Sequence, residues 1–113
     1  MNKKSIGERL VELISPIINV SYIQAEVSQF PYCAYDIESL TPVRDKKGIR
    51  AYTASVSIYV VAEKESQADT LKDQILDALN SDNNWGFILQ NTTAATDQGH
   101  WSYRLEYLIT QIL

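Results

Sequence analysis

The sequence predicts an α+β fold: a mostly antiparallel sheet of four to five strands, two helices packed on one face, and a long β-hairpin that projects. Three observations lead to this class. Two segments carry apolar residues at helical spacing, and two long segments alternate with the period of a strand. The elements follow in the order helix, two strands, helix, two strands, so consecutive strands form hairpins. At 113 residues the chain suits one domain, which we expect to span residues 1–113.

The first helix is predicted from Ser5 to Ser15. Ser5 and Glu8 form an S-x-x-E capping box, in which each side chain binds a free N–H group of the first turn. Pro16 disfavours helical geometry at the residue before it, so the helix ends there. The apolar side chains at helical spacing form one stripe, which consists of Ile6, Leu10, Leu13, Ile14 and Ile17.

A long hairpin is predicted after this helix. Residues 19–31 come first, with a short strand signal at Val20, Tyr22 and Ile23. Tyr32 to Leu40 then reads as a strand that turns Cys33, Tyr35, Ile37 and Ser39 toward the core. We expect Thr41–Gly48 to be a polar loop, because it contains the turn residues Pro42 and Gly48. Ile49–Ala62 alternates over a dozen residues and is the clearest strand.

The second half repeats the pattern of a helix followed by two strands. A helix is predicted from Ser66 to Asn80, with Ser66 and Asp69 as a capping pair. Trp85–Asn91 is predicted as a strand, Thr92–Gly99 as a loop, and His100–Leu113 as the last strand. The buried stripe of the helix is expected to hold Ala68, Leu71, Ile75, Leu76 and Leu79.

Composition limits the partners. The net charge of −4 argues against general nucleic-acid binding, and no apolar run approaches the ~20 residues of a membrane span. The N-terminus MNKKSIGERL has no long apolar core of a signal peptide. We therefore expect a cytoplasmic protein that binds neither a membrane nor a specific nucleic-acid sequence. The single cysteine, Cys33, excludes an intramolecular disulfide.

No catalytic constellation stands out. His100 is the only histidine, so no histidine or thiolate metal cluster is expected, and a Cys33–His100 nucleophile–base pair would require the fold to bring the two together. Asp36 and Glu38 lie on one strand face, where they could bind a cation or act as acid and base; they also suit an ordinary exposed face. We expect no catalytic residue, no metal and no cofactor.

Two features point to assembly contacts. The stretch RDKKGIR, at the predicted hairpin tip, holds four of the ten basic residues: Arg44, Lys46, Lys47 and Arg50. A solvated loop, a contact with an acidic neighbour and a contact with DNA all remain open for it. Tyr32 and Tyr59 are expected to point away from the core, and exposed tyrosines favour protein interfaces.

The order of these segments resembles the tail terminator, or tail completion, proteins of long-tailed (lambda-like, siphophage-type) bacteriophages and prophages. The residues that carry the resemblance are SIGERLVELI, FPYCAYDIES, the long strand IRAYTASVSIYVVAE, the helix ESQADTLKDQILDALN and the aromatic strand HWSYRLEYLI. The resemblance implies a virion structural protein that forms a ring, commonly hexameric, on the tail tube. It implies three partners: further copies of the chain, the tail tube protein and the head–tail connector. It also implies a location in the bacterial cytoplasm during assembly and at the head-proximal end of the tail afterwards.

Other functions remain open from the sequence. Another head–tail joining protein shares the same class of role, a small host-encoded α+β binding module is a second class, and an enzyme is a third. Neighbouring genes for a major tail protein and a tape measure would favour the phage role.

Overall fold

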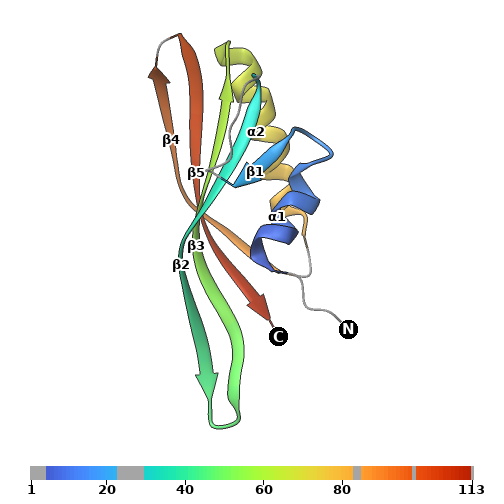
Figure 1. Ribbon diagram of the computed structural model, residues 1–113, viewed down its shortest axis with the longest axis vertical. Coiled ribbons are helices and arrows are strands. Elements are labelled where there is room, and N and C mark those ends of the chain that lie inside the picture. The colour runs from blue at the N-terminus through green and yellow to red at the C-terminus, as the bar shows by residue number, and fades with distance from the viewer. Residues whose placement is uncertain (1–4, 23–29, 83–84, 98, 113) are drawn as a thin grey trace.

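Five strands form one sheet, and two helices lie along one of its faces (Figure 1). The structure is a computed structural model and describes residues 5–22, 30–82, 85–97 and 99–112. Its elements, in chain order, are α1 (Ile6–Ile14), β1 (Val20–Tyr22), β2 (Tyr32–Asp45), β3 (Gly48–Ala62), α2 (Glu65–Asn80), β4 (Gly86–Asp97) and β5 (His100–Ile112).

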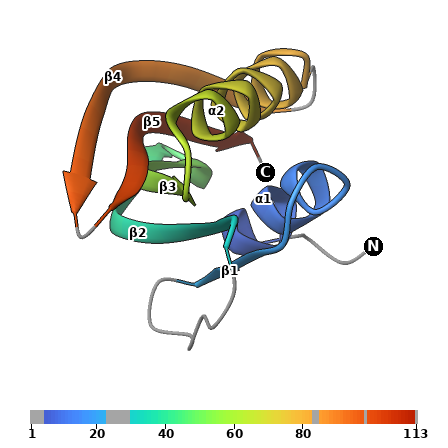
Figure 2. The same cartoon turned by 90° about the horizontal axis from the view of Figure 1, so that it is seen from above.

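The strands lie in the order β1-β2-β3-β5-β4. Each neighbouring pair is antiparallel except β1 and β2, which are parallel. Seen along the strands, α1 and α2 lie on the same side of the sheet, and no described helix covers the opposite face (Figure 2). We call this opposite side the outer face and the other the helix face. The predicted α+β class is confirmed.

The core lies between the helix face and the two helices. Alternation along β3 turns Ala54, Val56 and Ile58 inward, and all three are at most 1% exposed. The stripe of α1 packs against them through Leu10 and Ile14, which are fully buried. The capping box is present as predicted, since the Ser5 side chain binds the Glu8 N–H and the Glu8 side chain binds the Ser5 N–H.

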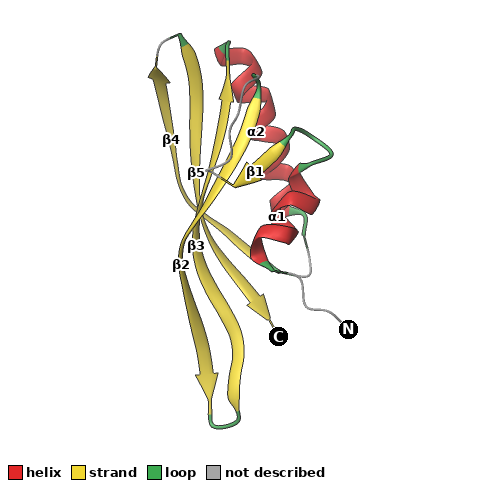
Figure 3. Ribbon diagram, viewed as in Figure 1, coloured by secondary structure: helices red, strands yellow, loops and turns green. Residues whose placement is uncertain are grey.

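The predicted loop Thr41–Gly48 is wrong. β2 continues to Asp45 and β3 begins at Gly48, so Lys46 and Lys47 alone connect the strands (Figure 3). Pro42 fits within β2 because β1 pairs only with Cys33–Tyr35, and at a free edge a missing N–H breaks no ladder bond. Gly48 has a φ of 122°, which favours glycine, and the Asp45 carboxylate accepts a 2.7 Å hydrogen bond from the Lys47 N–H.

Two further boundaries differ from the prediction. The loop expected at Thr92–Gly99 is mostly strand, because β4 runs to Asp97. Its threonines are polar but β-branched, and such side chains suit an extended backbone. The predicted cap at Ser66 and Asp69 is also wrong: α2 begins at Glu65 with Lys64 as its N-cap, and no side chain closes that cap.

The short strand predicted from Val20 and Tyr22 is confirmed as β1, while Ile23 lies outside the described residues. The β2–β3 hairpin extends beyond the helices (Figure 1). The molecule is accordingly elongated, with extents of 52 × 26 × 26 Å.

Candidate assembly surface

The hairpin tip presents a local positive charge. All four of its basic residues, Arg44, Lys46, Lys47 and Arg50, are exposed. Residues 44–50 hold four basic residues and one acidic residue, so they carry +3 while the rest of the chain carries −7 of the total −4. The Arg50 Nε lies 3.2 Å from the Asp45 Oδ2, but the Arg50 side chain is 73% exposed. The tip is therefore a solvated cationic surface on an acidic protein, and its role as an assembly contact stays a prediction.

The two tyrosines singled out from the sequence lie on the outer face. Tyr59 is level with Ala34 of β2 and Arg104 of β5, and the Arg104 guanidinium carbon lies 5.8 Å from the centre of its ring. The Tyr32 ring lies against Phe30 at a centroid distance of 5.4 Å. Both rings are half-buried, so each already has neighbours within the chain. Their role as assembly contacts stays a prediction.

A polar cluster that the sequence analysis missed lies at the centre of the outer face. Ser57 is fully buried, and its hydroxyl donates to the Glu38 carboxylate and accepts from the Arg104 Nε at 3.1 Å. The Arg104 Nη2 lies 3.3 Å from Glu106 and 3.5 Å from Glu38. We call these four residues the outer-face network. They join β2, β3 and β5, so the charges at the middle of the outer face are paired with one another.

A register argument could have found part of this network. Ser57 pairs with Glu106 across β3 and β5. Arg104 precedes Glu106 by two residues, so both side chains lie on the same face of β5. The position of Glu38 could not be obtained in that way. A β-bulge at Glu38 shifts the pairing between Ile37 and Ser39, and a bulge depends on tertiary structure.

The candidate chemical groups are engaged elsewhere. Cys33 lies in the core, and burial raises the pKa of its thiol to about 12, so the thiol stays protonated at neutral pH. The His100 ring stacks on Phe30 at a centroid distance of 4.1 Å. Glu38 belongs to the outer-face network, and the Asp36 carboxylate accepts a 3.5 Å hydrogen bond from the Tyr22 hydroxyl. Within the described residues, no group of three or more His, Cys, Asp or Glu side chains could hold a metal ion.

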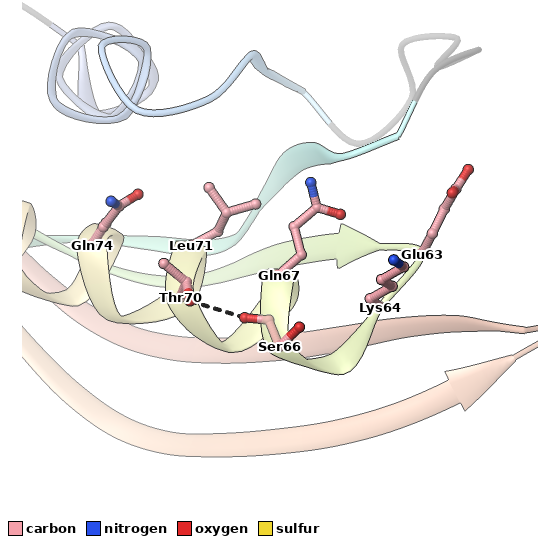
Figure 4. Close-up of a pocket in the computed structure, with 7 residues that line it drawn as sticks. All are labelled: Glu63, Lys64, Ser66, Gln67, Thr70, Leu71 and Gln74. Carbon is pink, nitrogen blue, oxygen red and sulfur yellow. Dashed lines mark hydrogen bonds between the residues drawn. The ribbon is translucent and has the colours of Figure 1, made fainter.

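Surface hollows lie beside both helices. The first lies along α2 and is lined by Glu63, Lys64, Ser66, Gln67, Thr70, Leu71 and Gln74 (Figure 4). It is open and polar, and the Thr70 hydroxyl within it donates to the Ser66 carbonyl at 2.9 Å. This hydrogen bond is an ordinary helix contact. The hollow brings together no pair of groups that would perform chemistry.

The second hollow, the α1 groove, lies between α1 and the base of the hairpin, with a volume of about 420 Å³. Helix α1 lies so close to the sheet here that a Cβ atom added at Gly7 would be only 2.7 Å from the Tyr35 hydroxyl oxygen. Leu40, at the hairpin end of the groove, is 54% exposed. The groove is lined by Ser5, Ile6, Gly7, Tyr22, Tyr35, Ile37, Leu40, Tyr52 and Gln111. Such a lining suits an apolar or aromatic side chain of a protein partner.

An ion pair joins the middle of α1 to the segment that follows α2. The Arg9 guanidinium donates to both Asp82 carboxylate oxygens, at 3.3 Å and 2.6 Å, and also binds Glu12. The pairing raises the pKa of Arg9 despite its partial burial. The Arg9 side chain is only 14% exposed. In the part of the chain that the structure describes, no helix is both long and apolar enough to cross a membrane.

Comparison with known proteins adds one finding. Neither a protein-family model nor a curated protein matches the chain. Among solved structures, it is similar to a chain of the "Virion of native gene transfer agent (GTA) particle", with a TM-score of 0.64 and 15% sequence identity. The match covers 89% of this chain and 82% of that chain. At this identity the similarity shows a shared fold.

Proposed function

We propose that this protein is a virion structural protein that acts as a tail terminator. In this role, copies of the chain form a ring, commonly a hexamer, that caps the tail tube and joins it to the head–tail connector. The observation that carries the proposal is the shared fold with a chain of a gene transfer agent virion, a phage-like particle, over 89% of this sequence. The resemblance of the segment order to tail terminators supports the same role independently of the fold.

The surface is consistent with subunit packing. No described helix covers the outer face, and the charges at its centre are paired within the outer-face network. The hairpin extends past the helices, where a neighbouring copy could contact it. A head-to-tail interface closes into a ring when the rotation between copies permits. An acidic chain also suits a ring through which DNA passes, because a basic lumen would hold the DNA back.

The proposal fixes the partners and the place of action. They are further copies of the chain, the tail tube protein and the head–tail connector, which meet in the bacterial cytoplasm during assembly and at the head-proximal end of the tail in the virion. The whole chain acts as one domain, and we assign it no catalytic role, metal or cofactor. The hairpin tip and the tyrosines Tyr32 and Tyr59 are the proposed contacts.

Electron microscopy of tail tubes tests this role. Purified tube protein is polymerised with and without the protein, and the lengths and ends of the tubes are compared. We expect ring-shaped density at one tube end and an arrest of elongation. Tubes that elongate normally and carry no added density at either end would rule out the terminator role. A substitution at the hairpin tip, Tyr32 or Tyr59 that leaves the fold unchanged but abolishes capping would then show that the substituted residue contacts the tube or a neighbouring copy.

A further inference from the structure

Exposed hydrophobic side chains gather at opposite edges of the sheet. The hairpin group consists of Leu40, Val43 and Ile49, with exposed fractions of 54%, 46% and 37%. The β4 group consists of Ile88 and Leu89, with exposed fractions of 55% and 38%. In the strand order β1-β2-β3-β5-β4, the hairpin group lies on β2 and β3, near the β1 edge of the sheet. The β4 group lies on the strand at the opposite edge. Each copy therefore presents two separate apolar edges.

Both edges also leave backbone groups without a strand partner among the described residues. Beyond Tyr35 no described strand pairs with the outer edge of β2, because β1 pairs only with Cys33–Tyr35. At the other edge β4 is open along its length, and residues 88–96 are all exposed. From Gly86 to Thr96 it reads GFILQNTTAAT, with no charge and no proline. Natural sheets usually protect an open edge with lysine, proline or a covering element, so an uncharged edge of this length favours strand addition.

The side chains of the two edges match face by face. Leu40 is level with Ala54 and Leu89 with Tyr107, so both point to the helix face. Val43 is level with Ala51, and Ile88 with Leu108, which places both on the outer face. When two strands lie side by side, same-face side chains become neighbours. Edge-to-edge contact would therefore bury apolar side chains on both faces of the seam.

The strand directions also match. β2, β3, β5 and β4 alternate in direction, so β4 runs antiparallel to β2. A second copy rotated about an axis along the strands would place its β2 antiparallel to this β4. The sheet would then continue across the boundary with its alternation unbroken.

We propose that the open edge of β2, from Asp36 to Thr41, in one copy lies along β4, from Gly86 to Asn91, in a second copy of this chain, because the pairing through β3 and β5 keeps these two segments level under that rotation. The interface is head-to-tail: the β2 edge of each copy contacts β4 of one neighbour, and its own β4 contacts the β2 edge of the other neighbour. A symmetric β4–β4 contact would cover the β4 group but leave the hairpin group exposed in both copies. Charge favours the head-to-tail form as well, since a tip of +3 meets a neighbour whose remaining residues carry −7. This inference deepens the proposed ring and rests on that role for closure.

Cysteine cross-linking tests the contact, because the single native cysteine, Cys33, is buried and protonated. Ser39→Cys and Asn91→Cys place one thiol on each edge, at exposed positions of the outer face that are two strand positions apart in level. Each variant is prepared separately and the two are mixed with a short bis-maleimide. We expect cross-linked dimers in the mixture and none with either variant alone. The double variant should give a ladder that ends at a closed ring. A mixture of Ser39→Cys with Gln74→Cys, which lies on α2, is the matched control.

Two results would overturn the inference. Asn91→Cys that cross-links efficiently to itself would show a symmetric β4–β4 contact. A mixture that cross-links no better than the Gln74→Cys control would show that these edges do not meet. Neither result depends on tube capping. A ring that caps tubes without these cross-links would leave the proposed function intact and refute this interface alone.

A charge placed on β4 gives a second, independent measurement. Ile88→Lys adds an edge lysine opposite Leu108, whereas Gln74→Lys adds the same charge on α2. If β4 pairs with the neighbour, Ile88→Lys should raise the concentration needed for oligomers by at least about tenfold, because the charge would lose water in the seam. Gln74→Lys should leave that concentration unchanged. Light scattering measures both, and equal effects of the two variants would contradict the proposal.

Discussion

Removal of the positive charge at the hairpin tip should separate folding from assembly. The variant replaces Arg44, Lys46, Lys47 and Arg50 with serine and changes the net charge from −4 to −8. These side chains make one ion pair with the described residues, from the 73% exposed Arg50 to Asp45. Exposed pairs contribute about 0–1 kcal/mol. The Asp45 hydrogen bond to the Lys47 backbone N–H survives the change. We therefore expect the free energy of unfolding to stay within about 1 kcal/mol of the original.

Assembly should respond much more strongly than folding. If the tip meets an acidic surface of a neighbour, the loss of four positive charges should weaken capping of tail tubes by at least about tenfold at low salt. The original protein should also lose affinity as salt rises, because exposed charges are screened, while the variant should show little salt dependence. Urea denaturation measures the fold, and electron microscopy of tubes across a salt series measures capping.

The control variant keeps the positive charge of the tip but replaces each guanidinium group with an ammonium group. Arg44→Lys with Arg50→Lys should cap tubes nearly as well as the original protein if the contact is a general electrostatic one. A serine variant that unfolds would refute the placement of these residues on an exposed turn. A serine variant that folds and caps tubes normally at low salt would refute the tip as an assembly contact.

Three further predictions concern the fold, and urea denaturation tests each of them. Tyr107→Phe should raise the free energy of unfolding by about 1 kcal/mol, because the buried hydroxyl has no hydrogen-bond partner among the described residues; a loss of stability would show that it has one. Arg9→Ala should lower the free energy of unfolding by about 1.5–3 kcal/mol, since it removes two charge-assisted hydrogen bonds to Asp82, whose side chain is 2% exposed. The control Glu12→Ala should lower the free energy of unfolding by less than about 1 kcal/mol, because the pair that it removes is more exposed. Burial raises the pKa of Cys33 from 9.0 to about 12, so the folded state holds this proton longer than the unfolded state does. The stability that it contributes is complete below pH 9 and falls as the pH rises toward 12, and Cys33→Ala should remove that part of the slope.

The candidate site was only partly predictable. The sequence placed the basic segment at a hairpin tip and turned Tyr59 to the outer face, and both follow from local signals. It did not reveal that Ser57 is buried under Glu38 and Arg104, because that cluster combines three strands and depends on a bulge. The ion pair between Arg9 and Asp82 was missed for a similar reason, since it joins positions 73 residues apart.

The sequence by itself determined the elements and most of their inward faces. The prediction that Ser39 faces the core is wrong: the bulge between Ile37 and Ser39 places it on the outer face, where it is exposed. Hydrophobic periodicity follows from which side of each helix or strand is buried, so α1, α2 and the long strands β3 and β5 could be read directly. It failed where polar residues continue a strand. Thr41–Asp45 and Thr92–Asp97 resemble loops in composition, but their backbone groups are paired with β3 and β5.

The tertiary structure decided which edges stay open. The parallel β1 covers only the start of β2, and β4 lies at the far edge beyond β5. No local pattern encodes that arrangement, because it depends on the order in which distant strands pair. The two apolar edges on which the proposed contact between copies rests are a consequence of that order.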